Sequence, residues 1–129
     1  MEKRVFKSVS HLECVGTSWH GVLIRSSLSQ LLRFFGLKLC NVDLGSQYDK
    51  TRYSLFIKTK GLPAFSVYDR CVFRCGHFTV DEFDTVVDWH LGTFNEYVDR
   101  RTVSLLRNLG LDICYFSVDS FESVDDLPF

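Results

Sequence analysis

Residues 18–36 read SWHGVLIRSSLSQLLRFFG, and this stretch decides the predicted fold because its apolar residues change from strand spacing to helix spacing. From Leu12 to Ile24 the residues alternate between two faces, which is typical of one long strand or two short ones. Ser27 and Gln30 then form a capping box ahead of leucines at helical spacing, and Gly36 is placed to end the helix. The stretch therefore predicts a strand followed by a helix.

A second stretch repeats this pattern. The dipeptide Trp-His occurs at residues 19–20 and again at residues 89–90, each time within a pattern of alternating residues. Thr93 with Glu96 forms a second capping box, and the helix that follows is predicted to stop at Gly110. In both strands we expect the tryptophan to face the apolar core and the histidine to face away.

The remaining segments complete the predicted order of elements. Residues 52–58 and 64–68 alternate on either side of a turn and predict a hairpin, while residues 41–50 read as a polar connection. Residues 71–80 are ambiguous between strand and loop, and residues 111–118 are β-like. The order is roughly β-α-β-β-β-α-β, which predicts an α+β fold: a mainly antiparallel sheet with two helices on one face.

Length and composition predict one globular domain over residues 1–118, with an acidic and mobile tail over residues 119–129. No apolar run is long enough for a membrane span, and the basic N-terminus at residues 1–7 lacks the apolar stretch of a signal peptide. We therefore expect a cytoplasmic protein that makes no membrane contact.

The two parts of the chain carry opposite charge. Residues 1–80 hold 12 Lys and Arg against 5 Asp and Glu, or +7, while residues 81–129 hold 3 against 11, or −8. This asymmetry indicates either a basic face for an anionic ligand and an acidic face for a basic partner, or opposite faces that neutralise each other in the fold.

Five cysteines cannot all pair within the chain, so reduced thiols are expected. Cys71, Cys75 and His77 have a spacing compatible with three zinc ligands, but a fourth ligand is missing nearby. We therefore predict no metal and no cofactor, and keep a zinc-stabilised interaction module as an alternative.

Basic residues lie on or beside the hairpin and alternate with aromatic residues: Arg52, Lys58, Lys60, Arg70 and Arg74. Such mixtures can bind phosphates and stack on bases. No RNP-type motif or helix-turn-helix is present, so general nucleic-acid binding is not expected. A nucleotide or a small signalling molecule fits better, and a solvated sheet face is the structural alternative.

The two histidines of the Trp-His pairs have both a functional and a structural interpretation. If the two strand-helix units arose by duplication, a pseudo-two-fold axis could bring His20 and His90 into one cleft suited to phosphate binding or acid-base chemistry. Coincidence and a purely structural histidine are the alternatives. The chain lacks the G-x-S-x-G, G-x-x-x-x-G-K, G-x-G-x-x-G and H-E-x-x-H signatures, which favours a non-enzymatic protein.

Three strings of this sequence resemble a group of short bacteriophage proteins. Residues 16–21 match a G-T-x-x-x-G opening, residues 31–36 match L-x-x-x-F-G, and residues 89–92 match W-H-[IL]-G. The resemblance covers about residues 12–109 and implies a phage accessory protein in the host cytoplasm, without implying a mechanism. Thr93 replaces a second glycine that is usual in the group, which puts the conservation of any shared site in doubt.

Together these patterns predict a non-enzymatic accessory protein that acts by binding in anti-defence or host takeover. It would inhibit a host protein or sequester a nucleotide signal. The sequence does not decide whether the protein forms a homodimer. The alternative is a small enzyme that acts on a phosphorylated or nucleotide substrate through His20 and His90, with Asp88 as a possible third group. The predicted ligand-binding residues are Thr17, His20, Arg52, Arg70, His90 and Gly92.

Overall fold

The computed structural model describes residues 5–45, 51–70 and 80–115. Within these ranges the chain forms strands and helices in the order β-η-β-α-η-β-β-β-η-β-α-β, where short 3₁₀ turns carry the label η. The strands are β1 (Phe6–Ser8), β2 (Ser18–Ser26), β3 (Asp43–Leu44), β4 (Thr51–Thr59), β5 (Phe65–Arg70), β6 (Val87–Thr93) and β7 (Ile113–Tyr115). The helices are α1 (Leu28–Phe35) and α2 (Glu96–Asn108), and the 3₁₀ turns are η1 (His11–Cys14), η2 (Leu39–Asn41) and η3 (Val80–Phe83).

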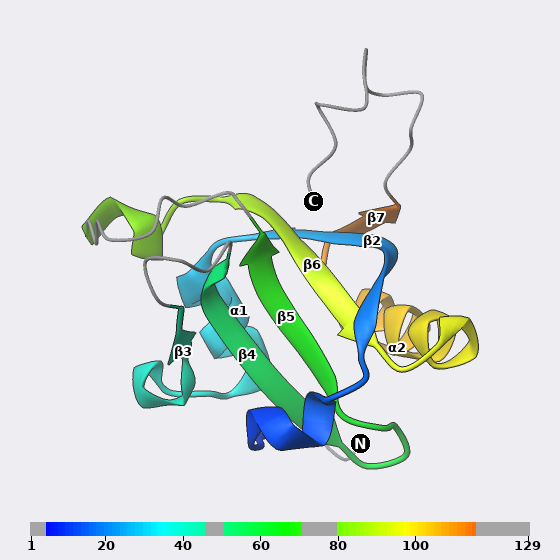
Figure 1. The fold of residues 1–129 in the computed structure, drawn as a ribbon. Coiled ribbons are helices and arrows are strands. Elements are labelled where there is room, and N and C mark those ends of the chain that lie inside the picture. Colours follow the sequence, from blue (N-terminus) through cyan, green and yellow to red (C-terminus); the bar gives the residue numbers. More distant parts are fainter. Residues whose placement is uncertain (1–4, 46–50, 71–79, 116–129) are drawn as a thin grey trace.

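The described strands form one antiparallel sheet in the order β1-β4-β5-β6-β2-β7, with β3 paired to β4 (Figure 1). Both helices contribute to a single apolar core: Leu31 of α1 and Leu106 of α2 are fully buried in the same cluster as Trp89 of β6. The predicted α+β fold, with two helices on one face of a mainly antiparallel sheet, is confirmed.

Helix α1 begins and ends where the sequence predicts. The Ser27 hydroxyl accepts the Gln30 amide N–H at 3.2 Å, and the Gln30 side chain accepts the Ser27 N–H at 3.1 Å, so the capping box is complete. Gly36 closes the helix with a φ of 67°, a left-handed conformation that favours glycine.

The predicted start of the second helix is wrong. Thr93 is the last residue of β6, and its hydroxyl donates to the Asp99 carboxylate at 2.9 Å instead of capping the helix. Asn95 is the N-cap, and its side chain accepts the Val98 N–H at 2.9 Å. The reason is that pairing with β2 keeps the chain extended through Thr93, opposite Ser18.

Two other predicted boundaries also differ in the structure. The predicted polar connection over residues 41–50 contains β3, whose Leu44 pairs with Tyr53 of β4. The predicted strand from Leu12 begins only at Ser18, because residues 11–14 form η1, in which Ser10 caps the Leu12 N–H.

Strand β2 bends at a bulge. Trp19 lies opposite Gly92 and Leu23 lies opposite His90, so β2 uses two more residues than β6 between these pairs. Gly21 lies within this interval and has a φ of 93°, which a side chain would strain. Figure 1 shows the resulting bend between the two halves of β2.

Some predictions fall on residues outside the described ranges. These are the zinc hypothesis on Cys71, Cys75 and His77, the basic residue Arg74, and the acidic tail over residues 119–129. Among the described residues, no helix is long and apolar enough to cross a membrane.

The cap of α1 gives a stability test. We expect Ser27→Ala to lower the free energy of unfolding by about 1 kcal/mol, because it leaves the Gln30 N–H without its acceptor. Chemical denaturation measures this. Ser104→Ala, at an exposed position inside α2, is the matched control and should be neutral or slightly stabilising. Equal losses in both variants would contradict the role of the cap.

Candidate functional site

The face of the sheet opposite α1 and α2 carries a row of three rings from three neighbouring strands. The rings of Trp19 (β2) and His90 (β6) have centroids 4.4 Å apart, and those of Tyr68 (β5) and His90 are stacked at 5.5 Å with an interplanar angle of 24°. The prediction that both tryptophans face the core is therefore wrong for Trp19, which shares the face of His90. It is correct for Trp89, which is fully buried in the core.

Pairing between strands explains the position of Trp19. Directly paired residues point to the same side of a sheet, and Ile24 pairs with Trp89 while Leu23 pairs with His90. Val22, Ile24 and Ser26 therefore face the core. Trp19 pairs with Gly92, which points to the same side of β6 as His90, so Trp19 faces away from the core. Trp19 and Leu23 do share one side of the strand, as the alternation predicts, but their large apolar side chains indicated the wrong side as the core side.

A close approach of strands lies beside these rings. Gly92 pairs with Ser66 of β5 and with Trp19 of β2. A Cβ atom added at Gly92 would clash with the Ser66 hydroxyl oxygen and would lie 3.3 Å from Tyr68 Cε1 and 3.5 Å from Thr17 Oγ1. We call these six residues the aromatic face: Thr17, Trp19, Ser66, Tyr68, His90 and Gly92.

Accessibility differs among the three rings. Trp19 and Tyr68 are half-buried, whereas His90 is only 1% exposed. Burial raises the pKa of the Tyr68 hydroxyl, and the positive charge of Arg70 opposes this. A ligand on this face would therefore touch Trp19 and Tyr68, with His90 as the buried support between them.

Arg70 belongs to the same face of β5 as Ser66 and Tyr68, because residues two apart in a strand point the same way. Its side chain is half-buried, and among the described residues its Nε–H has no hydrogen-bond acceptor. No described residue accepts a hydrogen bond from this buried N–H group.

His20 lies elsewhere. Its Nε2 is 3.2 Å from the Thr93 carbonyl oxygen and 3.4 Å from the Ser18 hydroxyl. Burial raises the pKa of the Asp99 carboxyl of α2, and the hydrogen bond from Thr93 and the positive charge of His20 oppose this. Since a carbonyl oxygen only accepts, the contact with Thr93 favours a proton on Nε2. In that form His20 is not a base for Ser18, which removes the simplest nucleophile-base pair. The two imidazoles lie on opposite faces of the sheet and do not line one cleft.

The orientation of the tryptophans also bears on duplication. A two-fold axis perpendicular to a sheet keeps every side chain on its own face, so equivalent residues of two antiparallel strands would share a face. Trp19 and Trp89 lie on opposite faces, so this axis does not relate the two Trp-His strands.

Arg52 is held in a separate network near η3. Its Nε is 3.3 Å from a Glu82 carboxylate oxygen, with both side chains 12% exposed, and Tyr53 donates a hydrogen bond to the same oxygen. The Asp69 carboxylate accepts the backbone N–H groups of Arg52 at 3.1 Å and Tyr53 at 2.5 Å. Of the predicted ligand-binding residues, Thr17, Arg70, His90 and Gly92 share one face, whereas Arg52 and His20 lie apart from it.

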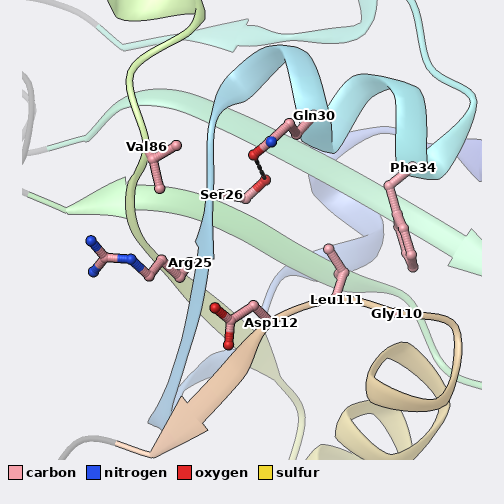
Figure 2. Close-up of a pocket in the computed structure, with 8 residues that line it drawn as sticks. All are labelled: Arg25, Ser26, Gln30, Phe34, Val86, Gly110, Leu111 and Asp112. Carbon is pink, nitrogen blue, oxygen red and sulfur yellow. Dashed lines mark hydrogen bonds between the residues drawn. The ribbon is translucent and has the colours of Figure 1, made fainter.

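A hollow of about 450 Å³ lies between the start of α1 and the chain that leads into β7 (Figure 2). Part of its polar lining is already paired, because the Gln30 side-chain oxygen accepts from the Ser26 hydroxyl and the Ser27 N–H. In Figure 2 the Arg25 guanidinium points away from Phe34 and Leu111. The segments that follow both Trp-His pairs line the hollow, but neither histidine does.

The sequence analysis missed Tyr68, Trp19 and Ser66 as members of the candidate site. Tyr68 was visible as an aromatic residue two positions before Arg70 on the same strand. Its position against His90 depends on the pairing of β5 with β6, which no local pattern contains. No group of three or more His, Cys, Asp or Glu residues that could hold a metal ion occurs within the described ranges.

Comparison with known proteins adds no relative: no protein-family model, curated protein or solved structure matches the chain.

The close approach at Gly92 can be tested by substitution. We expect Gly92→Ala to destabilise the protein by about 1–3 kcal/mol, because the new methyl group must displace its neighbours on β5. Ser66→Ala in the same chain should recover at least about 0.5 kcal/mol of that loss, since it removes the clashing oxygen. Thermal or chemical denaturation of the two single variants and the double variant measures this coupling, and strictly additive effects would contradict the contact.

The Tyr53 network predicts a dependence on alkaline pH. Burial, together with the hydrogen bond to Glu82, raises the pKa of Tyr53 to about 12. The unfolded chain loses this proton near pH 10, so stability should fall by about 2 kcal/mol as the pH rises from about 10 to about 12. Tyr53→Phe should remove this part of the pH dependence in denaturation experiments. Tyr97→Phe, at a 70% exposed residue, should retain it.

Proposed function

We propose that the protein acts by binding and not by catalysis, and that its aromatic face takes the planar ring of a small, nucleotide-like ligand. The observation that carries this proposal is the row of Trp19, His90 and Tyr68 on the helix-free side of the sheet, with Arg70 on the same side of β5. Aromatic platforms beside a cationic group are typical of sites for bases and phosphates.

Stacking on Trp19 and Tyr68 would supply most of the affinity. Both rings are half-buried, so each is fixed by the fold and still reaches the surface. The Trp19 indole N–H donates to the Val22 carbonyl at 2.8 Å, which fixes the ring across the bulge of β2. Stacking of a base on an aromatic ring contributes about 1–3 kcal/mol.

The smaller residues of the face support the same interpretation. Gly92 has no side chain above the sheet, and the Thr17 hydroxyl is held by the Cys14 carbonyl at 2.7 Å. Ser66, Tyr68 and Thr17 pack closely over Gly92, and this packing helps to fix the Tyr68 ring in the row. The Arg70 guanidinium, on the same side of β5 as Tyr68, would meet a phosphate at the end of the row.

The biological setting of this proposal rests on the resemblance to short bacteriophage proteins. In that setting the protein would act in the host cytoplasm and remove a nucleotide signal from a defence pathway. Among the described residues, His20 Nε2 contacts the Thr93 carbonyl oxygen, and a proton on this nitrogen would prevent it from acting as a base for Ser18, which favours binding over turnover.

Inhibition of a host protein is the second candidate. Apolar side chains are exposed in the turn that precedes Thr17: Leu12 is 68% exposed and Val15 is 67% exposed. Phe94 is 38% exposed and would touch a Cβ atom at Gly16. Exposed apolar groups of this kind favour a protein interface.

A fluorescence titration tests the nucleotide proposal. Trp19 is half-buried at the face and Trp89 is fully buried in the core, so a panel of cyclic and linear nucleotides should change the emission of Trp19. Trp19→Phe should abolish this change. Arg70→Gln should weaken binding about fivefold to tenfold, and Arg33→Gln, at an exposed position on α1, should leave it unchanged.

A thermal-shift panel provides an independent measurement. Absence of stabilisation by every nucleotide at millimolar concentration would overturn the nucleotide proposal. Binding that is equally strong in the Trp19→Phe and Arg70→Gln variants would place the ligand on another surface.

A further inference from the structure

A separate group of cationic side chains surrounds the turn between β4 and β5. Lys7, Lys58 and Lys60 line a hollow of about 320 Å³, together with Val5 and Thr59. A smaller hollow of about 190 Å³ shares Lys60 and adds Arg101 of α2. We call Lys7, Lys58, Lys60 and Arg101 the basic groove.

The positive charges in this groove lie close together. Lys7 lies directly opposite Lys58 in the pairing of β1 with β4, and like charges in such pairs destabilise a sheet. The residues that line the two hollows include no Asp or Glu. Within the described ranges, no ion pair includes Lys7, Lys58 or Arg101.

Two of the four cations are fixed by the turn itself. The Lys58 ammonium group donates to the carbonyl oxygens of Thr59, at 3.3 Å, and of Leu62. The Arg101 guanidinium donates to the Gly61 carbonyl at 3.1 Å. These bonds hold both positive groups at the turn and leave further N–H donors on each.

We propose that the basic groove binds the linked phosphate groups of a polyphosphate anion. Ammonium and guanidinium groups recognise phosphate oxygens through charge-assisted hydrogen bonds, and a chain of phosphates would neutralise neighbouring lysines together. No aromatic ring lines either hollow, and the Tyr97 ring beside the groove packs against the Arg101 guanidinium, 5.7 Å from the ring centroid. Recognition in the hollows would therefore depend on charge and not on stacking. The site is independent of the aromatic face and of the nucleotide proposal.

Protection of a sheet edge is the competing explanation. β1 is the outermost strand beside β4, and lysines on edge strands prevent pairing with other chains. This explanation accounts for Lys7, but it does not account for Arg101, which lies on α2 and reaches the turn. The two explanations differ in whether a phosphate compound binds.

Calorimetric titration with inorganic tripolyphosphate at low salt tests the proposal on the full chain. We expect binding by the wild type and a fivefold to tenfold higher Kd for the double variant Lys7→Gln/Lys60→Gln, because two exposed charge contacts are lost. The matched control is Arg33→Gln/Lys38→Gln, which removes two exposed positive charges near α1 and should bind like the wild type. Circular dichroism of each variant verifies that the fold is kept.

Two further ligands identify the source of the phosphates. A nucleoside triphosphate should bind as tripolyphosphate does, and Trp19→Phe should leave the tripolyphosphate titration unchanged. Binding of a single-stranded oligonucleotide that weakens in the Lys7→Gln/Lys60→Gln variant would identify a nucleic-acid backbone, while its failure to bind would identify a small polyphosphate. The proposal is overturned if tripolyphosphate does not bind, or if both double variants change its Kd equally.

Discussion

The antiparallel pairing of β2 with β6 is the contact on which the rest of the structure depends. It places Ile24 opposite Trp89 in the core, and the Trp89 indole N–H donates to the buried Ser26 carbonyl at 2.8 Å. That hydrogen bond fixes the chain one residue before the Ser27 cap of α1. The position of α1 over the sheet therefore follows from a tryptophan of a strand far along the chain.

The same pairing creates the aromatic face. Once Ile24 and Trp89 face the helices, Leu23 and His90 must face the other way, because neighbouring residues of a strand point to opposite sides. Trp19 joins His90 on that side, and β5 adds Tyr68. The core and the candidate site are thus two sides of one strand pair, so substitutions at Gly92 affect stability and the site together.

The two proposed binding surfaces use different chemistry at different parts of the sheet. The aromatic face offers rings with one cation beside them, whereas the hollows of the basic groove are lined by cations and by no aromatic ring. The positive charges of residues 1–80 therefore lie in different parts of the structure. Part of it surrounds the β4–β5 turn, and Arg52 instead forms an ion pair with Glu82, a residue of the acidic C-terminal part.

The sequence by itself determined the features that depend on neighbours along the chain: the capping box and closing glycine of α1, the β4–β5 hairpin, and the α+β class. The tertiary structure alone decided features that depend on strand pairing. These include the side taken by Trp19, the added strand β3, the N-cap at Asn95, and the separation of His20 from His90. The physical reason is that alternation shows which residues share a face but not which face is buried. In β2 both faces carry large apolar residues, so only the partner strand distinguishes them.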